Sequence, residues 1–360
     1  MIGLPPFLSF SENERILQLK ILMIILRTVK NISSLNIAAS VLLFLAAILA
    51  AVVANSSLSP VYQDFLLQEL HLRIGNFNLF SHGGHPLKMI EFINDCLMTV
   101  FFLAVGLEIK RELLVGELSS VRKAALPFIA ACGGMVVPVV IYALSVASST
   151  PETRGMAIPM ATDIAFSLGV LSLLGKRVPL SLKIFLTAFA VVDDIGGILV
   201  IALFYSADVA YGYLIAAAVL YVFLYYMGKF GVTQKIFFLF FGVIIWYLFL
   251  QSGIHSTISG VILAFVIPAR PRLDAGKYIE RIRDIIGEFP VSKSDNIVLT
   301  NAQIATLKQV ERASDYVISP LQSLEDNLHG AVSFVILPLF AFANAGVVFS
   351  GSGSIVGDVS

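Results

Sequence analysis

Long apolar stretches separated by short polar segments recur along this 360-residue chain. Many are close to the roughly 20 residues that a helix needs to cross the hydrocarbon core of a bilayer. The pattern predicts an all-α polytopic membrane protein with about nine spans, of which the first eight fill residues 36–268. We place the spans at residues 36–54, 89–108, 124–147, 156–174, 183–205, 210–228, 233–251, 254–268 and 330–349.

The segments outside these spans have distinct compositions. Residues 1–35 form a cytoplasmic N-terminal segment in which basic and apolar residues interleave, as in an amphipathic helix on the membrane surface. On the other side of the membrane, polar and apolar residues alternate and are followed by Gly-Gly. This pattern predicts a small outside β-hairpin at about 70–85. An isolated hairpin is marginally stable, so we expect it to pair with a partner, plausibly a second copy. Residues 269–329 are expected to be a charged, partly helical cytoplasmic loop, and residues 350–360 an outside tail.

Composition supports membrane insertion and argues against nucleic acid. The chain is 58% hydrophobic and 13% charged, whereas soluble domains carry about 25% charged residues. Its net charge is zero, so no basic surface suggests nucleic acid as a partner. The two cysteines, Cys96 and Cys132, lie within predicted spans and outside any Cys/His cluster, so we interpret them as small apolar fillers.

The basic residues indicate which way the spans run. If the N-terminus is cytoplasmic, all but Arg73, Lys88 and Arg154 of the 24 Lys and Arg residues fall on the cytoplasmic side. Cytoplasmic loops carry such an excess. No cleavable signal is evident near the N-terminus.

The adjacent acids Asp193 and Asp194 lie in the middle of the apolar run 184–205. A charge at membrane depth costs roughly 2.5–3.5 kcal/mol on insertion scales, so two in succession indicate cation or proton transport. On a helix they point about 100° apart, so one should face the transport site and the other a neighbouring helix. Gly196 and Gly197 would let a second backbone approach closely. A structural salt bridge is the alternative interpretation.

The segment 156–174 should be a broken helix. Pro159 removes a backbone hydrogen bond and Gly169 weakens the helix further on. Between them stand Thr162 and Asp163, where freed carbonyls and helix ends could bind an ion. The alternative is a proline-kinked packing helix with a buried threonine.

Further polar residues lie at both ends of the second span. Asp95, next to Asn94 near the outer boundary, could line a cation entry funnel or be hydrated at the interface. At the cytoplasmic end stand Glu108, Arg111 and Glu112, beside Lys110. This cluster could anchor the topology, or it could attract cations and sense pH.

Two polar residues in later spans have simpler interpretations. Asn344 is expected to form a hydrogen bond between helices, and His255 to be a satisfied or interfacial histidine.

Four segments together closely resemble the NhaA-type sodium/proton antiporter family, over about residues 36–348. They are FINDCLMTVFFLAVGLEIKREL, ATDIAFSLGVLSLLGKRVPLSLKIFLTAFAVVDDIGG, SGIHSTISGVILAFVIP and ILPLFAFANAGV. The resemblance implies a secondary transporter, not an enzyme. It would exchange one Na⁺ or Li⁺ for two protons, electrogenically and with alkaline activation, in the bacterial inner membrane. It also implies a homodimer held through the outside hairpin, and no cofactor beyond the transported ions.

By motif match, the resemblance implies roles for individual residues. Asp163, Asp194 and Thr162 would bind Na⁺, and Asp193 would be the accessory carboxylate. Glu108, Arg111 and Glu112 would belong to the pH-sensing mouth.

The chain also departs from the family pattern. The family fold has twelve spans, and a lysine in the tenth pairs with the residue matching Asp193. This sequence ends at Ser360 after the ninth predicted span. We therefore expect the 360-residue chain alone to lack normal antiport. A truncated, inactive or regulatory paralogue is the alternative function.

An intramembrane aspartyl protease also needs two membrane carboxylates that share a proton. Its helices typically present Tyr-Asp and Gly-x-Gly-Asp, which the spans here lack, so this is a distant third interpretation. A channel is disfavoured because no filter-like loop is visible.

Overall fold

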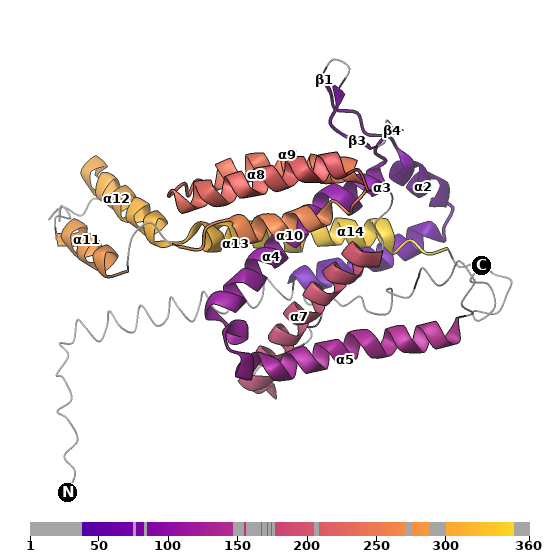
Figure 1. The fold of residues 1–360 in the computed structure, drawn as a ribbon, viewed down its shortest axis with the longest axis horizontal. Coiled ribbons are helices and arrows are strands. Elements are labelled where there is room, and N and C mark those ends of the chain that lie inside the picture. Colours follow the sequence, from indigo (N-terminus) through magenta and orange to yellow (C-terminus); the bar gives the residue numbers. More distant parts are fainter. Residues whose placement is uncertain are drawn as a thin grey trace, which may run out of the picture.

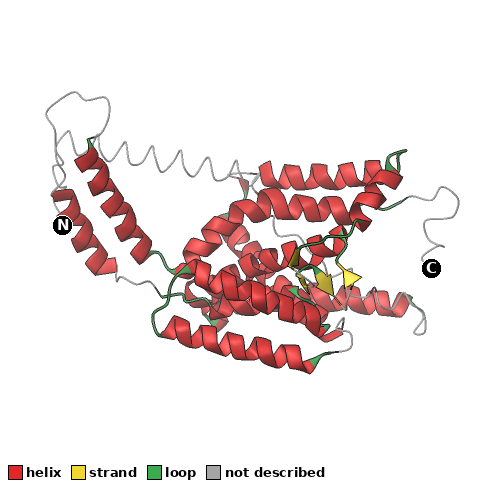
Figure 2. Ribbon diagram, turned by 90° about the horizontal axis from the view of Figure 1, so that it is seen from above, coloured by secondary structure: helices red, strands yellow, loops and turns green. Residues whose placement is uncertain are grey.

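The fold is almost entirely helical. The computed structural model describes residues 38–74, 77–82, 85–146, 155, 167, 171, 174, 177–204, 209–270, 275–287 and 300–348. Long helices run beside one another through most of the molecule (Figure 1; Figure 2). The segments named in the sequence analysis at 1–35 and 350–360 lie outside the described residues. The helices are Ala38–Ala54, α2 (Ser59–Leu67), α3 (Met89–Glu91), η1 (Phe92–Leu97), α4 (Met98–Val115), η2 (Glu117–Ser119), α5 (Val121–Ser145), α7 (Leu180–Phe204), α8 (Tyr211–Lys229), α9 (Lys235–Ser252), α10 (Thr257–Val266), α11 (Ala275–Gly287), α12 (Asn301–Val317), α13 (Pro320–Ala331), η5 (Val332–Ile336) and α14 (Leu337–Asn344).

Within the described residues, five helices are long and apolar enough to cross a membrane. A sixth is added if Ala38–Ala54 and α2, which meet at a bend of 113°, form one broken span. These helices confirm the predicted all-α polytopic class. The number nine stays a prediction, because most of 156–174 lies outside the described residues. The five are Met89–Val115, Ala124–Ser145, Tyr211–Lys229, Lys235–Ser252 and Pro320–Asn344.

Several helix boundaries differ from the predicted spans. The apolar helix at 254–268 is only the ten residues of α10. The helix of the predicted last span begins at Pro320, inside the segment expected to be a loop, because α13 continues into η5 and α14. Two further helices, α11 and α12, occupy much of the rest of that segment.

The polar segment before α3 contains two tight hairpins where one was predicted. Strands β1 (Arg73–Ile74) and β2 (Phe77–Asn78) pair antiparallel, and so do β3 (Ser81–His82) and β4 (His85–Pro86). A hydrogen bond of 2.8 Å from the Leu70 N–H to the Leu87 carbonyl closes their common base.

The Asn78 side chain explains why the ribbon divides. Its Oδ1 accepts hydrogen bonds from the backbone N–H groups of Leu72 at 3.0 Å and Phe80 at 3.2 Å. The Phe80 N–H is thereby satisfied locally, in the manner of an Asx turn. The chain can then turn and begin a second hairpin.

The largest hydrophobic cluster lies where α4, α8, α9, α10 and α13 meet. Its most deeply buried side chains include Leu107, Leu224, Phe238 and Ile245. The strands and α2 lie at one end of these helices, and α11 and α12 lie at the other (Figure 1). The two polar segments thus lie at opposite ends of the helices.

Helices α4 and α10 approach unusually closely through glycines. A Cβ added at Gly106 would lie 2.8 Å from the Ala264 Cβ, and one at Gly260 would collide with the Thr99 carbonyl oxygen. Only residues without a side chain fit such a contact. This contact fixes α4, which carries most of the charged residues predicted to form the mouth.

Candidate functional site

Asp193 is buried in the apolar helix α7. It is only 4% exposed, and its neighbours Val191 and Val192 are buried as well. Three leucines and two alanines precede the acidic pair in α7, and both residue types favour helix formation. A carboxylate this deep in an apolar helix is expensive to retain, which makes Asp193 a candidate site residue.

Helix α7 packs against α4 and α5 near the acidic pair. Val191 forms a small cluster with Val105 and Ile109 of α4. The carboxylate-bearing part of α7 therefore lies beside the half of α4 that leads to Glu108.

Among the described residues, no second backbone comes close to the glycines after the pair. A Cβ at Gly196 would meet the Met135 side chain of α5, and one at Gly197 would meet no described atom within 4 Å. The close approach of a second backbone stays a prediction, because most of the predicted span 156–174 lies outside the described residues.

The other predicted cation ligands are only partly described. Asp194 lies in α7, next to Asp193, and its side chain is outside the described set. Thr162 and Asp163 lie outside the described residues altogether. Within the described residues, no group of three or more His, Cys, Asp or Glu side chains is placed to bind a metal ion.

The charged cluster at the end of α4 forms a network with α13. Arg111 Nε donates to Glu325 Oε1 at 2.9 Å, and its Nη1 lies 3.2 Å from Glu112 Oε1. Glu112 is nearly buried, at 9% exposed, and Glu108 is half-buried on the same helix. Arg111 thus links two carboxylates from two helices.

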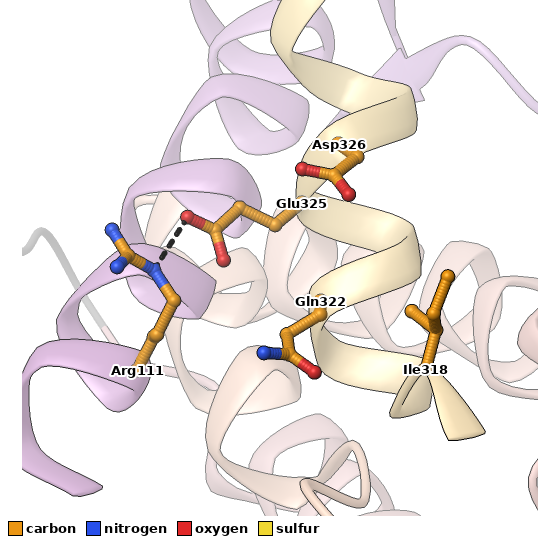
Figure 3. Close-up of a pocket in the computed structure, with 5 residues that line it drawn as sticks. All are labelled: Arg111, Ile318, Gln322, Glu325 and Asp326. Atoms are coloured by element: carbon orange, nitrogen blue, oxygen red, sulfur yellow. Dashed lines mark hydrogen bonds and ion pairs between the residues drawn. The ribbon is translucent and has the colours of Figure 1, made fainter. Parts of the chain in front are cut away.

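An open pocket of about 440 Å³ lies over this network. Figure 3 shows the Arg111 side chain reaching from α4 toward Glu325 on α13. Asp326 and Gln322 lie on the same face of α13, and Ile318 closes the side near α12. The pocket wall is therefore mainly polar and holds more carboxylates than cations.

Lys110 has a different function from its neighbours. Its Nζ donates to the carbonyl oxygens of Ala264 at 3.3 Å, Phe265 at 2.7 Å and Ile267. The last carbonyls of a helix have no partner within it, so a cation placed there stabilises that end. Lys110 therefore holds the end of α10 against α4.

At the opposite end of α4, the backbone around Asp95 forms the π-helix η1. The Asp95 carbonyl accepts from Thr99 Oγ1, from Trp246 Nε1 at 3.2 Å and from Ser256 Oγ at 3.1 Å. Ser256 also donates to Asp95 Oδ1 at 3.3 Å. These bonds join α4 to α9 and to the turn before α10.

Asn94, beside Asp95, pairs with Asn344 of α14. Each amide donates to the other, at 3.2 and 2.8 Å. The predicted hydrogen bond between helices at Asn344 is confirmed.

Sequence reasoning missed Glu325, Gln322 and Ser256. Glu325 and Gln322 lie in a segment interpreted as a loop because its polar residues interrupt any apolar run. A better signal was the spacing of Leu321, Leu324 and Leu328, which indicates an amphipathic helix. Ser256 had no distinguishing local signal.

The sequence pattern of one known family, described as Na⁺/H⁺ antiporter 1, matches residues 30–358. This chain belongs to the Na⁺/H⁺ antiporter 1 family. Membership in this antiporter family, together with the long apolar helices, makes the chain a multi-pass membrane protein. The resemblance inferred from the motifs is confirmed.

Several proteins named as antiporters of this family are similar over most of their length. The Na⁺/H⁺ antiporter NhaA of Bacteroides thetaiotaomicron is 76% identical over 337 residues, which cover 94% of this chain and 77% of that protein. The protein of the same name from Phocaeicola vulgatus is 62% identical over 300 residues, or 83% of this chain and 67% of that protein. The Na⁺/H⁺ antiporter NhaA 1 of Saccharophagus degradans is 44% identical over 308 residues, or 85% of this chain and 65% of that protein.

Proposed function

We propose that the chain is a secondary transporter, not an enzyme, that exchanges Na⁺ or Li⁺ for protons across the bacterial inner membrane. The observation that carries the proposal is the carboxylate of Asp193, only 4% exposed in the middle of an apolar helix. Membership in an antiporter family supports a role for that carboxylate in ion exchange.

A buried carboxylate can hold either a proton or a cation, because both neutralise its charge in a low-dielectric environment. In this proposal Asp194, Asp163 and Thr162 supply oxygen ligands for Na⁺. Asp193 is the accessory carboxylate whose charge state couples to theirs. Binding of the cation and binding of protons then exclude each other, which is the basis of exchange.

Regulation and access belong to the two ends of α4. Asp95 would line the entry on one side, and Glu108, Arg111 and Glu112 would sense pH at the cytoplasmic mouth and give alkaline activation. The ion pair between Arg111 and Glu325 supports this, because protonation of Glu325 would weaken the link between α4 and α13.

The decisive experiment measures Na⁺-driven proton movement in everted membrane vesicles from cells without other antiporters. In a protein that carries the family's full set of spans, Asp194→Asn or Asp193→Asn should abolish exchange. The matched control is Asp64→Asn, an exposed aspartate of α2, which should leave exchange unchanged. Unchanged exchange by Asp194→Asn would refute the assignment.

A second measurement separates binding from transport. Na⁺ should raise the thermal unfolding temperature of the purified chain, and Asp194→Asn should remove that shift. Na⁺ binding without any exchange would favour the alternative, an inactive or regulatory relative of the antiporters.

We further propose that the chain is a homodimer joined through the outside hairpins, with a cytoplasmic N-terminus. The base of the hairpins is anchored to the body, where Leu87 packs with Trp246 and Leu250 and Gln251 donates to the Ser81 carbonyl. Deleting 70–85 should therefore lower the dimer fraction more than it lowers transport. A dimer that survives this deletion in mild detergent would count against the proposal.

A further inference from the structure

The segment between α10 and α13 folds into two helices with little hydrophobic core of their own. Helices α11 and α12 pack against each other, and Figure 2 shows them side by side at one end of the molecule. Neither helix contributes a side chain to any of the hydrophobic clusters among the described residues. The pair therefore has apolar surface left to cover.

Helix α11 carries its apolar residues on one stripe, at helical spacing. Tyr278, Ile282 and Ile285 are half-buried. Ile279 and Ile286 form the other edge of the stripe, and they are 58% and 59% exposed. This edge is thus left without a covering element in the described structure.

The charges of α11 are ordered around this stripe. By helical period, Arg283 lies beside the exposed isoleucines and Arg281 flanks the opposite edge. Glu280 and Asp284 lie on the far side, and all four charged side chains are exposed. Basic residues at the border and acidic residues opposite the apolar stripe suit a lipid surface, because long basic side chains can reach phosphates while their stems stay in apolar surroundings.

The position of the pair favours the same occupant. Helix α11 follows α10, whose end Lys110 holds against α4. Helix α12 joins α13 through Ile318 and Ser319, and Ser319 Oγ caps α13 by accepting from the Gln322 N–H at 3.2 Å. Along the chain, the pair is thus flanked on both sides by helices of the main helical body, α10 and α13.

We propose that α11 docks on the anionic lipid headgroups of the adjacent leaflet. Ile279 and Ile286 enter the boundary between headgroups and acyl chains, and Arg283 contacts lipid phosphates. In a contact between two copies of this stripe, the Arg283 side chains of both copies would lie near each other and repel. Charge therefore favours a surface of lipid phosphates over a second copy. The proposal does not depend on the transport function.

The test places a nitroxide label on the whole protein in vesicles. Ile286→Cys is made in a Cys96→Ala, Cys132→Ala background, and Glu280→Cys, on the far side of α11, is the matched control. In vesicles containing phosphatidylglycerol, the label at 286 should be reached by oxygen in preference to a polar nickel chelate. The label at 280 should show the reverse preference.

Charge substitutions then identify the occupant. Arg283→Gln should lower the ratio of docked to undocked label about fivefold, the factor expected for one basic residue near an anionic surface. Lys277→Gln, on the polar face, should leave the ratio unchanged. The proposal is overturned if the label at 286 stays water-exposed in anionic vesicles. It is also overturned if protection of the label at 286 from the nickel chelate depends on the protein-to-lipid ratio and not on lipid charge. That result would indicate that a second copy of the chain covers the stripe.

Discussion

Two helix pairs next to each other hold their helices together in different ways. In the α4–α10 pair, Gly106 and Gly260 bring one helix directly against the other, so that an added Cβ would meet Ala264 or the Thr99 backbone. In the α5–α7 pair, the contacts near Gly134 and Gly196 are made by the ends of long side chains, those of Phe189 and Met135. The first contact is fixed by the backbone, whereas the second can adjust by changes of rotamer.

The polar side chains differ between the two helix pairs as well. The α4–α10 pair is closed at one end by Lys110 and at the other by Ser256. Asp193 lies on the adjustable pair. In this comparison α4 and α10 form a fixed frame, whereas the described contacts between α5 and α7 can adjust.

The largest expected effect comes from filling the glycine contact. Gly260→Ala should destabilise the protein by at least about 3 kcal/mol, the upper part of the range for overpacking, because the new Cβ would meet backbone that cannot move aside. Gly133→Ala in α5 is the matched control. It should be neutral or stabilising by up to about 1 kcal/mol, because no described atom lies within 4 Å of that Cβ.

Denaturation by dodecyl sulfate in mixed micelles would measure both variants. Equal stability of Gly260→Ala and Gly133→Ala would show that the two pairs are not packed differently.

The next effect in size concerns the cationic cap on α10. Lys110→Met keeps the aliphatic stem and removes the hydrogen bonds to the carbonyls of Ala264, Phe265 and Ile267. The loss should be about 2 kcal/mol, as for hydrogen bonds to charged groups. Lys229→Met, at the exposed end of α8, should change stability by less than about 0.5 kcal/mol. If both variants unfold alike, Lys110 does not hold the frame.

Hydropathy was sufficient to predict most of the long helices, because a long apolar run has few other stable structures in a membrane. It failed where polar residues interrupt the run. Helix α13 was interpreted as part of a loop, although Leu321 and Leu324 pack into the main core. Helix α2 and the second hairpin were missed because their apolar residues follow neither the helical period nor the strand period.

The sequence was sufficient to identify candidate site residues. It was not sufficient to predict which side chains they contact. The buried acids could be identified from their position inside an apolar run, and Asp193 is buried. Arg111 and Glu325, however, are 214 residues apart, and no local pattern links them. Such pairings depend on how helices meet, which a single sequence does not specify. The packing of α5 on α7 through Met135 was unpredictable for the same reason.

A smaller effect would show how strongly η1, at the Asp95 end of α4, is joined to α14. Asn94→Ala and Asn344→Ala should each destabilise the protein by about 1 kcal/mol. A double-mutant cycle should give a coupling of about 0.6–1.7 kcal/mol, the range for interhelical hydrogen bonds in membranes. Unfolding in mixed micelles supplies all four free energies. A coupling of zero would mean that the reciprocal amide bonds, at 3.2 and 2.8 Å, contribute nothing to stability.

The smallest expected effect tests the adjustable pair itself. In Gly196→Ala the new Cβ would collide with Met135 Sδ, which lies at the end of a flexible side chain and can rotate away. The free energy of unfolding should therefore change by less than about 1 kcal/mol, although the static clash is as severe as that at Gly260. Gly196→Ala combined with Met135→Ala should restore the original stability of Met135→Ala alone. If Gly196→Ala instead destabilises as strongly as Gly260→Ala, and Met135→Ala does not relieve it, then α7 is fixed by its backbone. The frame would then extend to the helix that carries Asp193.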